Sequence, residues 1–425
     1  MIYEVLRPIF RLSFLAYYKH IYIHNAYNYP KNKPILFAGN HPNAILDGII
    51  NCCVNNEKSV YMVSRGDVFL KPTMNKILRR LHLLPIFRVQ DGKELLYRNQ
   101  ATFDECVEIL GRNDCVNIYP EAVCVYEKRL RKLKNGTAKI AIQAYLQGID
   151  LYIVCVGMNY TYAKEYRSEV MIGYSNAVRV ADYADLIAEN EAKAVVAITK
   201  KMEEDLSTNV IHIQNPADEP LCEQLFMMAR NNFVRPILPH TIADQPERLR
   251  TEYHIAQLVS NAPPPQLAPA TQAYHALLSQ FHLQDSGVAE AKKTNFLQKV
   301  ALLLSTPIMV AAYALCMPPF LLAKRLTEKS PLKNAIEFYA SVNWLLGMIC
   351  FALYMLLFST VIGGVFGFKV GIISFFLLPI LGFLAQNWLE ATQTAHEQFK
   401  FGRLSKENQT KLQLHRKNIF EMLTL

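Results

Sequence analysis

Three long stretches without a formally charged residue constrain this chain more than any other feature. They cover residues 300–323, 339–368 and 370–389. A helix needs roughly 20 apolar residues to cross the hydrocarbon core of a bilayer, and each stretch is at least that long. In water such helices would expose apolar side chains on every face, which is unfavourable. The sequence therefore predicts an integral membrane protein.

The first stretch, residues 300–323, is compatible with two membrane structures. It contains Pro307 and the pair Pro318-Pro319. Proline removes a backbone donor and kinks or breaks a helix, so this stretch need not be one straight span. A re-entrant segment and a spanning helix both remain open.

Residues 339–389 predict a transmembrane hairpin. The second stretch is too long for one span, and glycines near its end mark a turn: Gly363, Gly364 and Gly367. Basic residues flank the hairpin: Lys324, Arg325, Lys329 and Lys333 before it, and Lys400, Arg403, Lys406 and Lys411 after it. The positive-inside tendency predicts that both ends face the cytoplasm. If the first stretch is re-entrant, the domain that precedes the three apolar stretches is cytoplasmic too.

The composition narrows the possible partners. Of the 425 residues, 51% are hydrophobic and 19% are charged, and the formal net charge is +9. A positive chain suits lipid headgroups, phosphate esters or an acidic carrier protein. The basic residues do not alternate with aromatic ones as in a nucleic-acid-binding module, so we expect no nucleic acid partner. The nine cysteines have no paired metal-ligand spacing, so we expect no metal site, and an odd count without a cleavable signal peptide indicates a reducing compartment.

The first 30 residues predict an amphipathic helix. Glu4, Arg7 and Arg11 recur at helical spacing and leave a broad apolar face on the rest of the helix. We expect this N-terminal helix, residues 1–30, to lie in the membrane interface. An ordinary helix packed on its own domain is the alternative.

Residues 31–215 alternate short apolar runs with longer amphipathic segments. The strand candidates are residues 35–38, 60–64, 84–88, 115–119, 151–158 and 170–174, and helix candidates between them include residues 72–81, 94–110 and 138–147. This alternation predicts an α/β domain with a largely parallel sheet flanked by helices. Ligands of such sheets bind at the carboxyl ends of the strands.

The segments after this domain differ in composition. Residues 216–299 contain two proline-rich runs and indicate a helical region or linker. The hydrophobic membrane region covers residues 300–390, and residues 391–425 form a basic C-terminal tail. The expected fold is thus an α/β domain followed by a helical region and a C-terminal transmembrane hairpin.

A histidine and an aspartate follow the first strand candidate. They are His41 and Asp47 in the stretch NHPNAILD at residues 40–47. Histidine is a suitable general base near neutral pH, and a carboxylate can fix its tautomer. The alternative is a capped turn in which Asp47 or Asn43 serves a helix N-terminus. Six positions do not share one helix face, so the two side chains meet only if the connection turns back.

Four sequence blocks resemble the PlsC-type glycerolipid acyltransferases. They are NHPNAILD at residues 40–47, LPIFR at 84–88, NIYPEA at 117–122 and IVCVGMNY at 153–160. They are similar, in the same order, to that family's NHxxxxD block, its strand ending in a phosphate-binding arginine, its FPEG block and its VPV-like block. The resemblance covers roughly residues 30–205.

Three departures from the family pattern stand out. The spacing from His41 to Asp47 is one residue wider than the commonest form and resembles a branch of glycerol-3-phosphate and dihydroxyacetone-phosphate acyltransferases. Ala122 replaces the glycine of FPEG, and Cys155 replaces the proline of the last block. The missing glycine puts a close backbone approach at that turn in doubt.

The resemblance implies acyl transfer from a thioester to an alcohol, with His41 as base and Asp47 as its orienting partner. Arg88 would grip the acceptor's phosphate, for which a surface salt bridge is the alternative. Glu121 would contact the acceptor hydroxyl or organise the basic residues, unless it caps a helix.

A basic segment follows Glu121 at residues 127–139, and it resembles the family's Arg-Leu-x-x-Leu-Lys-x-Gly segment. Within it, Arg131 and Lys134 would face the phosphate, with a solvated charged face as the alternative. Gly136 and Thr137 open the next helix, where an anion can bind. Arg65, at an earlier strand end, would approach the phosphate or the anionic arm of the donor.

The expected function is that of a membrane-bound O-acyltransferase of phospholipid biosynthesis. The donor would be acyl-CoA or acyl carrier protein, and the acceptor glycerol-3-phosphate or 1-acylglycerol-3-phosphate. No metal or organic cofactor is implied. Two alternatives remain: an acyltransferase for another lysolipid or an amino-acid-derived lipid, and a non-catalytic membrane protein that binds lipid.

Overall fold

The computed structural model describes residues 2–25, 28–55, 57–233 and 237–424. The chain divides into two compact units. The first contains the residues up to His212 together with His240–Leu249 and Ala335–Ser341, and the second contains the remaining segments. Each unit is described by itself.

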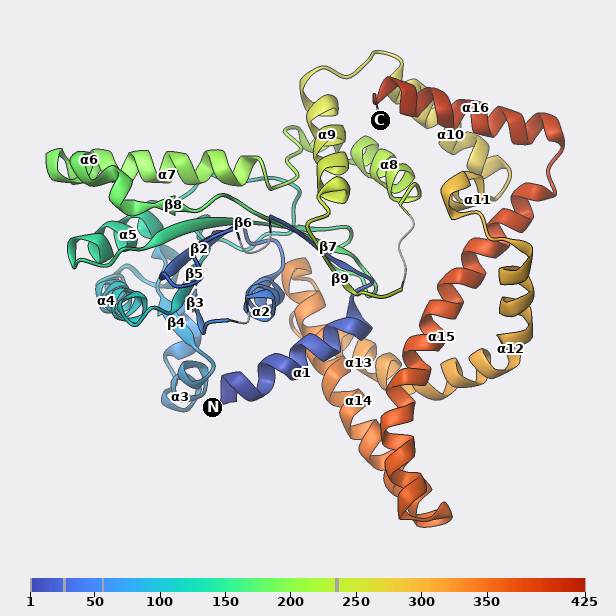
Figure 1. Ribbon diagram of the computed structural model, residues 1–425, viewed down its shortest axis with the longest axis horizontal. Coiled ribbons are helices and arrows are strands. Elements are labelled where there is room, and N and C mark those ends of the chain that lie inside the picture. The colour runs from blue at the N-terminus through green and yellow to red at the C-terminus, as the bar shows by residue number, and fades with distance from the viewer. Residues whose placement is uncertain (1, 26–27, 56, 234–236, 425) are drawn as a thin grey trace. The chain divides into compact units, whose positions relative to one another are not determined.

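The first unit is built on a single nine-stranded sheet (Figure 1). Its strands are β1 (Ile21–His24), β2 (Ile35–Gly39), β3 (Val60–Arg65), β4 (Leu83–Ile86), β5 (Cys115–Ile118), β6 (Tyr152–Tyr160), β7 (Val170–Tyr174), β8 (Val178–Arg179) and β9 (Thr241–Ala243). The strand order is β4-β3-β5-β2-β6-β7-β1-β9, and β8 pairs with β6. Strands β4, β3, β5, β2 and β6 are parallel, whereas β7 and β8 run antiparallel to β6.

Helices cover the sheet, and its central strands are buried on both faces. All five residues of β2 are buried, as are all four of β5. Along β2, Leu36 and Ala38 pack into one core with α4 (Arg98–Gly111), α5 (Gly136–Leu146) and α7 (Glu191–Ser207). Continuous burial of this kind is typical of parallel sheets with a helical layer on each side.

The remaining α-helices of this unit are α1 (Ile2–Tyr17), α2 (Ala44–Val54), α3 (Pro72–Arg80) and α6 (Ala184–Glu189). The predicted α/β class with a largely parallel sheet is confirmed. Every strand expected from the sequence is present, with ends that differ by at most two residues.

Two structural features differ from the sequence expectation. The N-terminal helix ends at Tyr17, and Ile21–His24 then form β1 rather than an extension of the interface segment. Residues 216–299, expected to be helical or a linker, also contain β9, which pairs with β1. Both strands are short and pair with partners distant in sequence, so no local periodicity marks them.

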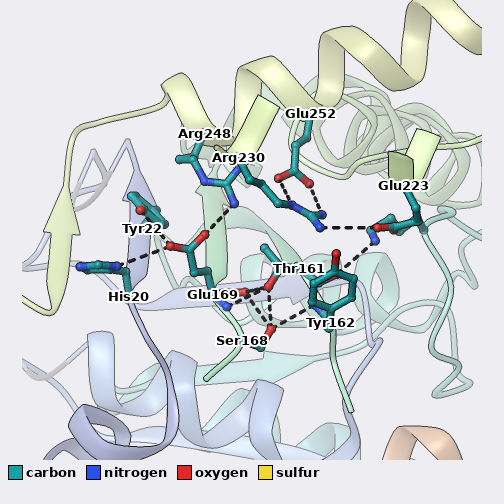
Figure 2. A network of polar contacts seen from close by, with 11 residues as sticks. His20, Tyr22, Thr161, Tyr162, Ser168, Glu169, Glu223, Arg230, Arg248 and Glu252 are labelled. Carbon is teal, nitrogen blue, oxygen red and sulfur yellow. Dashed lines mark hydrogen bonds and ion pairs between the residues drawn. The ribbon is translucent and has the colours of Figure 1, made fainter. Parts of the chain in front are cut away.

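A buried ion pair joins three elements of the first unit (Figure 2). Glu169 precedes β7, and its carboxylate lies 2.7 Å from an Nη atom of Arg248, which begins α9 (Glu247–Asn261). Glu169 also accepts a hydrogen bond from the hydroxyl of Tyr22 on β1, at 3.3 Å. Burial alone would raise the pKa of Glu169, but Arg248 and the hydrogen bond with His20 together lower it below its usual range.

The second unit is helical. Its elements are α8 (Glu219–Arg230), α10 (Leu267–Gln280), α11 (Asp285–Val288), α12 (Phe296–Cys316), α13 (Pro318–Lys329), α15 (Phe368–Gly402) and α16 (Lys406–Met422), with most of α9 and of α14 (Ile336–Phe366). Ion pairs tie its helices together. Arg416 binds Asp285 at 2.9 Å, and Arg230 binds Glu252 at 2.9 Å (Figure 2).

Three described helices are long and apolar enough to cross a membrane: α12, α14 and α15. Helices α14 and α15 turn at Gly367, whose φ of 99° is readily adopted only by glycine. A Cβ atom on Gly371 would lie 2.9 Å from the Cα of Gly363, so the two helices approach closely beside the turn. Helix α12 contains Pro307 without a break and ends before Pro318.

Candidate active site

The candidate site lies at one edge of the sheet, where the parallel strands β4, β3, β5, β2 and β6 end. Arg88 follows β4, Arg65 ends β3, Glu121 follows β5 and His41 follows β2. Parallel strands bring their carboxyl ends together at one edge, so residues far apart in sequence converge there. Tyr160, the last residue of β6, lies at the same edge.

His41 and Asp47 are in direct contact. Nδ1 of His41 lies 2.9 Å from Oδ2 of Asp47. The connection turns back at Ala44, which has a φ of 22° and begins α2, and Asp47 lies in the first turn of this helix. The predicted contact across six positions is therefore confirmed. With Nδ1 directed at the carboxylate, Nε2 is the nitrogen on the opposite side of the ring.

Asp47 is fully buried, and further donors hold it. Its Oδ2 accepts the backbone N–H of Asn43 at 2.7 Å, and its Oδ1 accepts the hydroxyl of Tyr160 at 2.6 Å. Burial and the neighbouring charge of Asp47 raise the pKa of Tyr160 well above its usual value, so its hydroxyl remains a donor. Asn43 makes no capping hydrogen bond through its side chain. The carboxylate thus orients His41 and satisfies one backbone donor at the start of α2.

Tyr119 stacks on one face of the His41 ring. The two rings stack with centroids 3.8 Å apart and an interplanar angle of 6°. Gly39, at the end of β2, leaves room for this arrangement, since a Cβ atom there would lie 3.2 Å from the Tyr119 ring. The imidazole therefore has a fixed plane as well as a fixed hydrogen-bond partner.

Glu121 links two loops through backbone hydrogen bonds. Its Oε2 accepts the N–H of His41 at 3.0 Å, and its Oε1 accepts the N–H of Arg131 at 2.8 Å. Burial raises the pKa of Glu121, although these two hydrogen bonds act in the opposite direction. The carboxylate holds the His41 connection against the basic segment that contains Arg131.

Ala122 adopts the backbone conformation that glycine would supply at this position. Its φ is 59°, in the left-handed region. The turn after Pro120 is therefore formed without glycine, at a cost of about 1–2 kcal/mol in backbone strain. This explains how the chain departs from the FPEG pattern and still directs Glu121 towards His41.

Substituting Ala122 by glycine is expected to stabilise the protein. The A122G change relieves the left-handed strain, and the net gain after the entropy loss of glycine is on the order of 0.5–1 kcal/mol. A thermal unfolding measurement in detergent should show a melting temperature higher by about 1–3 °C. The matched control is A101G at an exposed position inside α4, which should lower the melting temperature. Destabilisation by both variants would contradict this account.

The two arginines at the ends of β3 and β4 are both paired with aspartates. Arg88 binds Asp91 through two nitrogens, at 2.9 and 3.1 Å, and Arg65 binds Asp67 at 2.6 and 2.7 Å. Hydrogen bonds from these arginines lower the pKa of both aspartates. The side chain of Arg88 remains a quarter exposed. A bound phosphate would therefore compete with a carboxylate for each guanidinium.

The basic segment, residues 127–139, exposes Arg131 and Lys134 to solvent, whereas Lys128 is buried and donates to the carbonyl oxygen of Thr161 at 3.4 Å. The guanidinium of Arg131 pairs with Glu127, and the side chain of Lys134 is exposed. Gly136 begins α5, as expected, and the next residue, Thr137, is fully buried. Hydrogen bonds thus join His41, Asp47, Glu121 and the backbone of Arg131. In the described part of the chain, no side-chain hydrogen bond joins Lys134, Gly136 or Thr137 to that group.

Several residues of this site were missed by sequence reasoning. Tyr119 and Tyr160 lie inside motif blocks, but nothing in their spacing shows that one stacks on His41 and the other binds Asp47. Cys124 accepts the backbone N–H of Ala44 at 3.1 Å, and burial raises the pKa of its thiol, so it is not a ready nucleophile. Among the described residues, no group of three metal-ligating side chains is present.

Comparisons with known proteins show what this chain resembles. Residues 20–159 match the model of the protein family described as Acyltransferase. A stretch of 257 residues is 24% identical to Glycerol-3-phosphate O-acyltransferase 1 of Saccharomyces cerevisiae, and it covers 55% of this chain and 33% of that protein. The chain therefore spans about a third of the length of this relative. The crystal structure of the 1-acyl-sn-glycerophosphate acyltransferase PlsC from Thermotoga maritima is similar with a TM-score of 0.34 and 15% identity, over 47% of this chain and 78% of that one.

Proposed function

Because the chain belongs to the PlsC-type acyltransferase family, we propose that it transfers a fatty acyl group from a thioester donor to a glycerol phosphate. The donor is acyl-CoA or acyl carrier protein, and the acceptor is glycerol-3-phosphate or 1-acylglycerol-3-phosphate. The observation that carries this proposal is the contact between His41 and the buried Asp47 at the carboxyl edge of the sheet.

The geometry supports direct transfer with His41 as general base. Asp47 accepts the Nδ1–H, so Nε2 is free to take the proton from the acceptor hydroxyl. The hydroxyl oxygen attacks the thioester carbonyl and forms the ester bond while the carbon–sulfur bond breaks. His41 then gives the proton to the departing thiolate. Asp47 stabilises the imidazolium without being protonated.

Arg88 is the proposed phosphate ligand. A planar guanidinium can bind a phosphate through two parallel hydrogen bonds, as it now binds Asp91. Arg65 ends β3, the strand next to β4, and is the second proposed phosphate-binding cation. Arg131, Lys134, Gly136 and Thr137 remain proposed contributors to anion binding, and Glu121 the residue that organises the loops around them.

The proposed acceptor is glycerol-3-phosphate in the first place. The name of the yeast relative and the wider spacing between His41 and Asp47 support this choice. One observation favours the alternative of an acceptor without a phosphate: Arg88 and Arg65 are already neutralised by carboxylates. A non-catalytic lipid-binding role would leave the pairing of His41 with Asp47 unexplained.

The proposed membrane arrangement follows from the apolar helices. Residues 339–389 form the hairpin of α14 and α15, and residues 300–323 span or re-enter the membrane. Helix α1 carries an exposed apolar stripe, Ile2, Val5, Ile9 and Leu12, which supports an interfacial position. In this arrangement residues 31–215 are the acyltransferase domain, 216–299 a largely helical region and 391–425 a basic tail. The catalytic domain faces the cytoplasm.

An acceptor screen tests this function. The full chain is purified in detergent and incubated with labelled acyl-CoA or acyl carrier protein and, separately, glycerol-3-phosphate, 1-acylglycerol-3-phosphate, other lysophospholipids and amino-acid-derived lipids. Ester formation with a glycerol phosphate is the expected result. Product only with an acceptor that lacks a phosphate would support the alternative acceptor class. The absence of product with every acceptor would refute the proposed function.

Replacing Arg88 by alanine separates the two kinds of acceptor. R88A is expected to raise the KM for glycerol-3-phosphate roughly 10- to 100-fold with a smaller change in kcat, since a charge-assisted bidentate contact is lost. The matched control is R179A. Arg179 also pairs with an aspartate, Asp150, but lies beside the start of β6, at the opposite edge of the sheet. An unchanged KM in R88A would show that this arginine holds no phosphate.

A further inference from the structure

The helix that carries Asp47 receives no side-chain cap from the residue that precedes it. The first backbone N–H groups of a helix have no partner within the helix and need one from elsewhere. At the start of α2 the residue before the helix, Asn43, provides no side-chain hydrogen bond, and Ala44 has a strained φ of 22°. The carboxylate of Asp47 accepts the N–H of Asn43, but the N–H groups of Ala44 and Leu46 take partners outside α2.

Two distant side chains accept hydrogen bonds from the first turn of α2. The N–H of Ala44 donates to Sγ of Cys124 at 3.1 Å, and the N–H of Leu46 donates to Oγ of Ser341 at 3.3 Å. Both Leu46 and Ser341 are buried, so no water competes for the second contact. Leu46 immediately precedes Asp47, the residue that holds His41.

Ser341 belongs to the start of a membrane-length helix. Residues 335–341, here named the anchoring turn, comprise Ala335 and the first six residues of α14, and they are part of the same compact unit as the sheet. The hydroxyl of Tyr17 donates to the carbonyl oxygen of Ala340 at 3.2 Å, and Lys164 lies 4.8 Å from the centre of the Tyr339 ring. The anchoring turn thus contacts the end of α1, the start of α2 and the loop after β6.

We propose that Ser341 is a positioning residue for the general base: the anchoring turn of α14 caps the helix whose Asp47 orients His41. This inference rests on the proposed function and goes beyond it, because it makes the beginning of the membrane hairpin a part of the catalytic geometry. Loss of the cap lets the first turn of α2 shift, and the hydrogen bond between Asp47 and His41 then loses its alignment. The effect acts on turnover rather than on substrate binding.

The test compares S341A, which removes the acceptor, with S341T, which keeps the hydroxyl. The matched control is S359A on the same helix, because the hydroxyl of Ser359 has no hydrogen-bond partner among the described residues. In S341A we expect kcat to fall roughly 3- to 10-fold, as the loss of a helix cap implies, with KM unchanged. S341T should regain most of the rate, and S359A should equal the wild type.

Hydrogen exchange gives a readout that does not depend on activity. The amides at the start of α2, residues 43–50, should exchange faster in S341A than in the wild type or in S359A. An unchanged kcat and unchanged exchange in S341A would overturn the inference, as would an equal loss in S359A or a loss that S341T does not repair. If the wild type transfers no acyl group, the proposed function fails, while exchange still decides whether Ser341 holds α2.

Discussion

Replacing His41 by alanine is expected to reduce kcat by about 10²–10⁴-fold, the range for loss of a general base. The acceptor hydroxyl then has no group to take its proton during attack, while the sites that bind donor and acceptor remain. Only 19% of the His41 side chain is exposed, but it lies on a connection rather than in the hydrophobic core, so H41A should fold. Steady-state kinetics of the full chain in detergent measure the effect.

Two further variants give this prediction its controls. H396A removes an exposed imidazole from α15 and should leave kcat unchanged. D47N keeps the size of the side chain but removes the charge that stabilises the imidazolium, so it should also lower kcat strongly. Because the two residues act together, the double variant should be little worse than H41A alone. Turnover at the wild-type rate in H41A would remove His41 from the mechanism.

Substituting Arg248 by methionine is expected to lower the free energy of unfolding by about 3–5 kcal/mol. The change removes the main partner of the Glu169 carboxylate, which is only 17% exposed and lies 2.7 Å from Arg248. Thermal unfolding of R248M should show a large decrease in melting temperature. The control R250M removes an exposed arginine of the same helix and should have a small effect.

The pH dependence of stability follows from the same pair. The pKa of Glu169 is lowered in the folded protein from its ordinary value of 4.5. Its contribution is therefore complete above about pH 4.5 and is lost as the pH falls further, because protonation then favours the unfolded chain. The double variant R248M/E169Q should recover part of the stability lost in R248M and weaken this acid dependence. Equal stability of R248M and the wild type at neutral pH would contradict the assigned role.

Much of the sheet was predictable because its central strands are buried on both faces. Continuous apolar runs such as residues 35–38 are short and bounded by polar segments, and they were recognised as strands. β9 escaped recognition for a physical reason. It has three residues, two of them exposed, and among the described strands it pairs with β1, more than 200 residues away in sequence. Its structure is determined by tertiary pairing rather than by its own pattern.

The site was predictable where a single connection determines it. The contact of His41 with Asp47 follows from one loop and one helical turn, and the sequence required that the loop turn back. Tyr160 and Ser341 could not be found in this way, since they lie 113 and 295 positions from the residues they contact. The pairing of Arg88 with Asp91 was open as well, because an arginine at a strand end serves a ligand or a neighbouring carboxylate equally well.

The central claim is that His41, held by Asp47, activates an acceptor hydroxyl for direct attack on the thioester. One measurement tests it most directly: release of CoA from palmitoyl-CoA by the full chain with and without glycerol-3-phosphate, followed by the intact mass of the protein. The account predicts CoA release only with acceptor, one ester formed per CoA, and no acylated protein. A stoichiometric release of CoA without acceptor, together with a protein heavier by one acyl group, would contradict it.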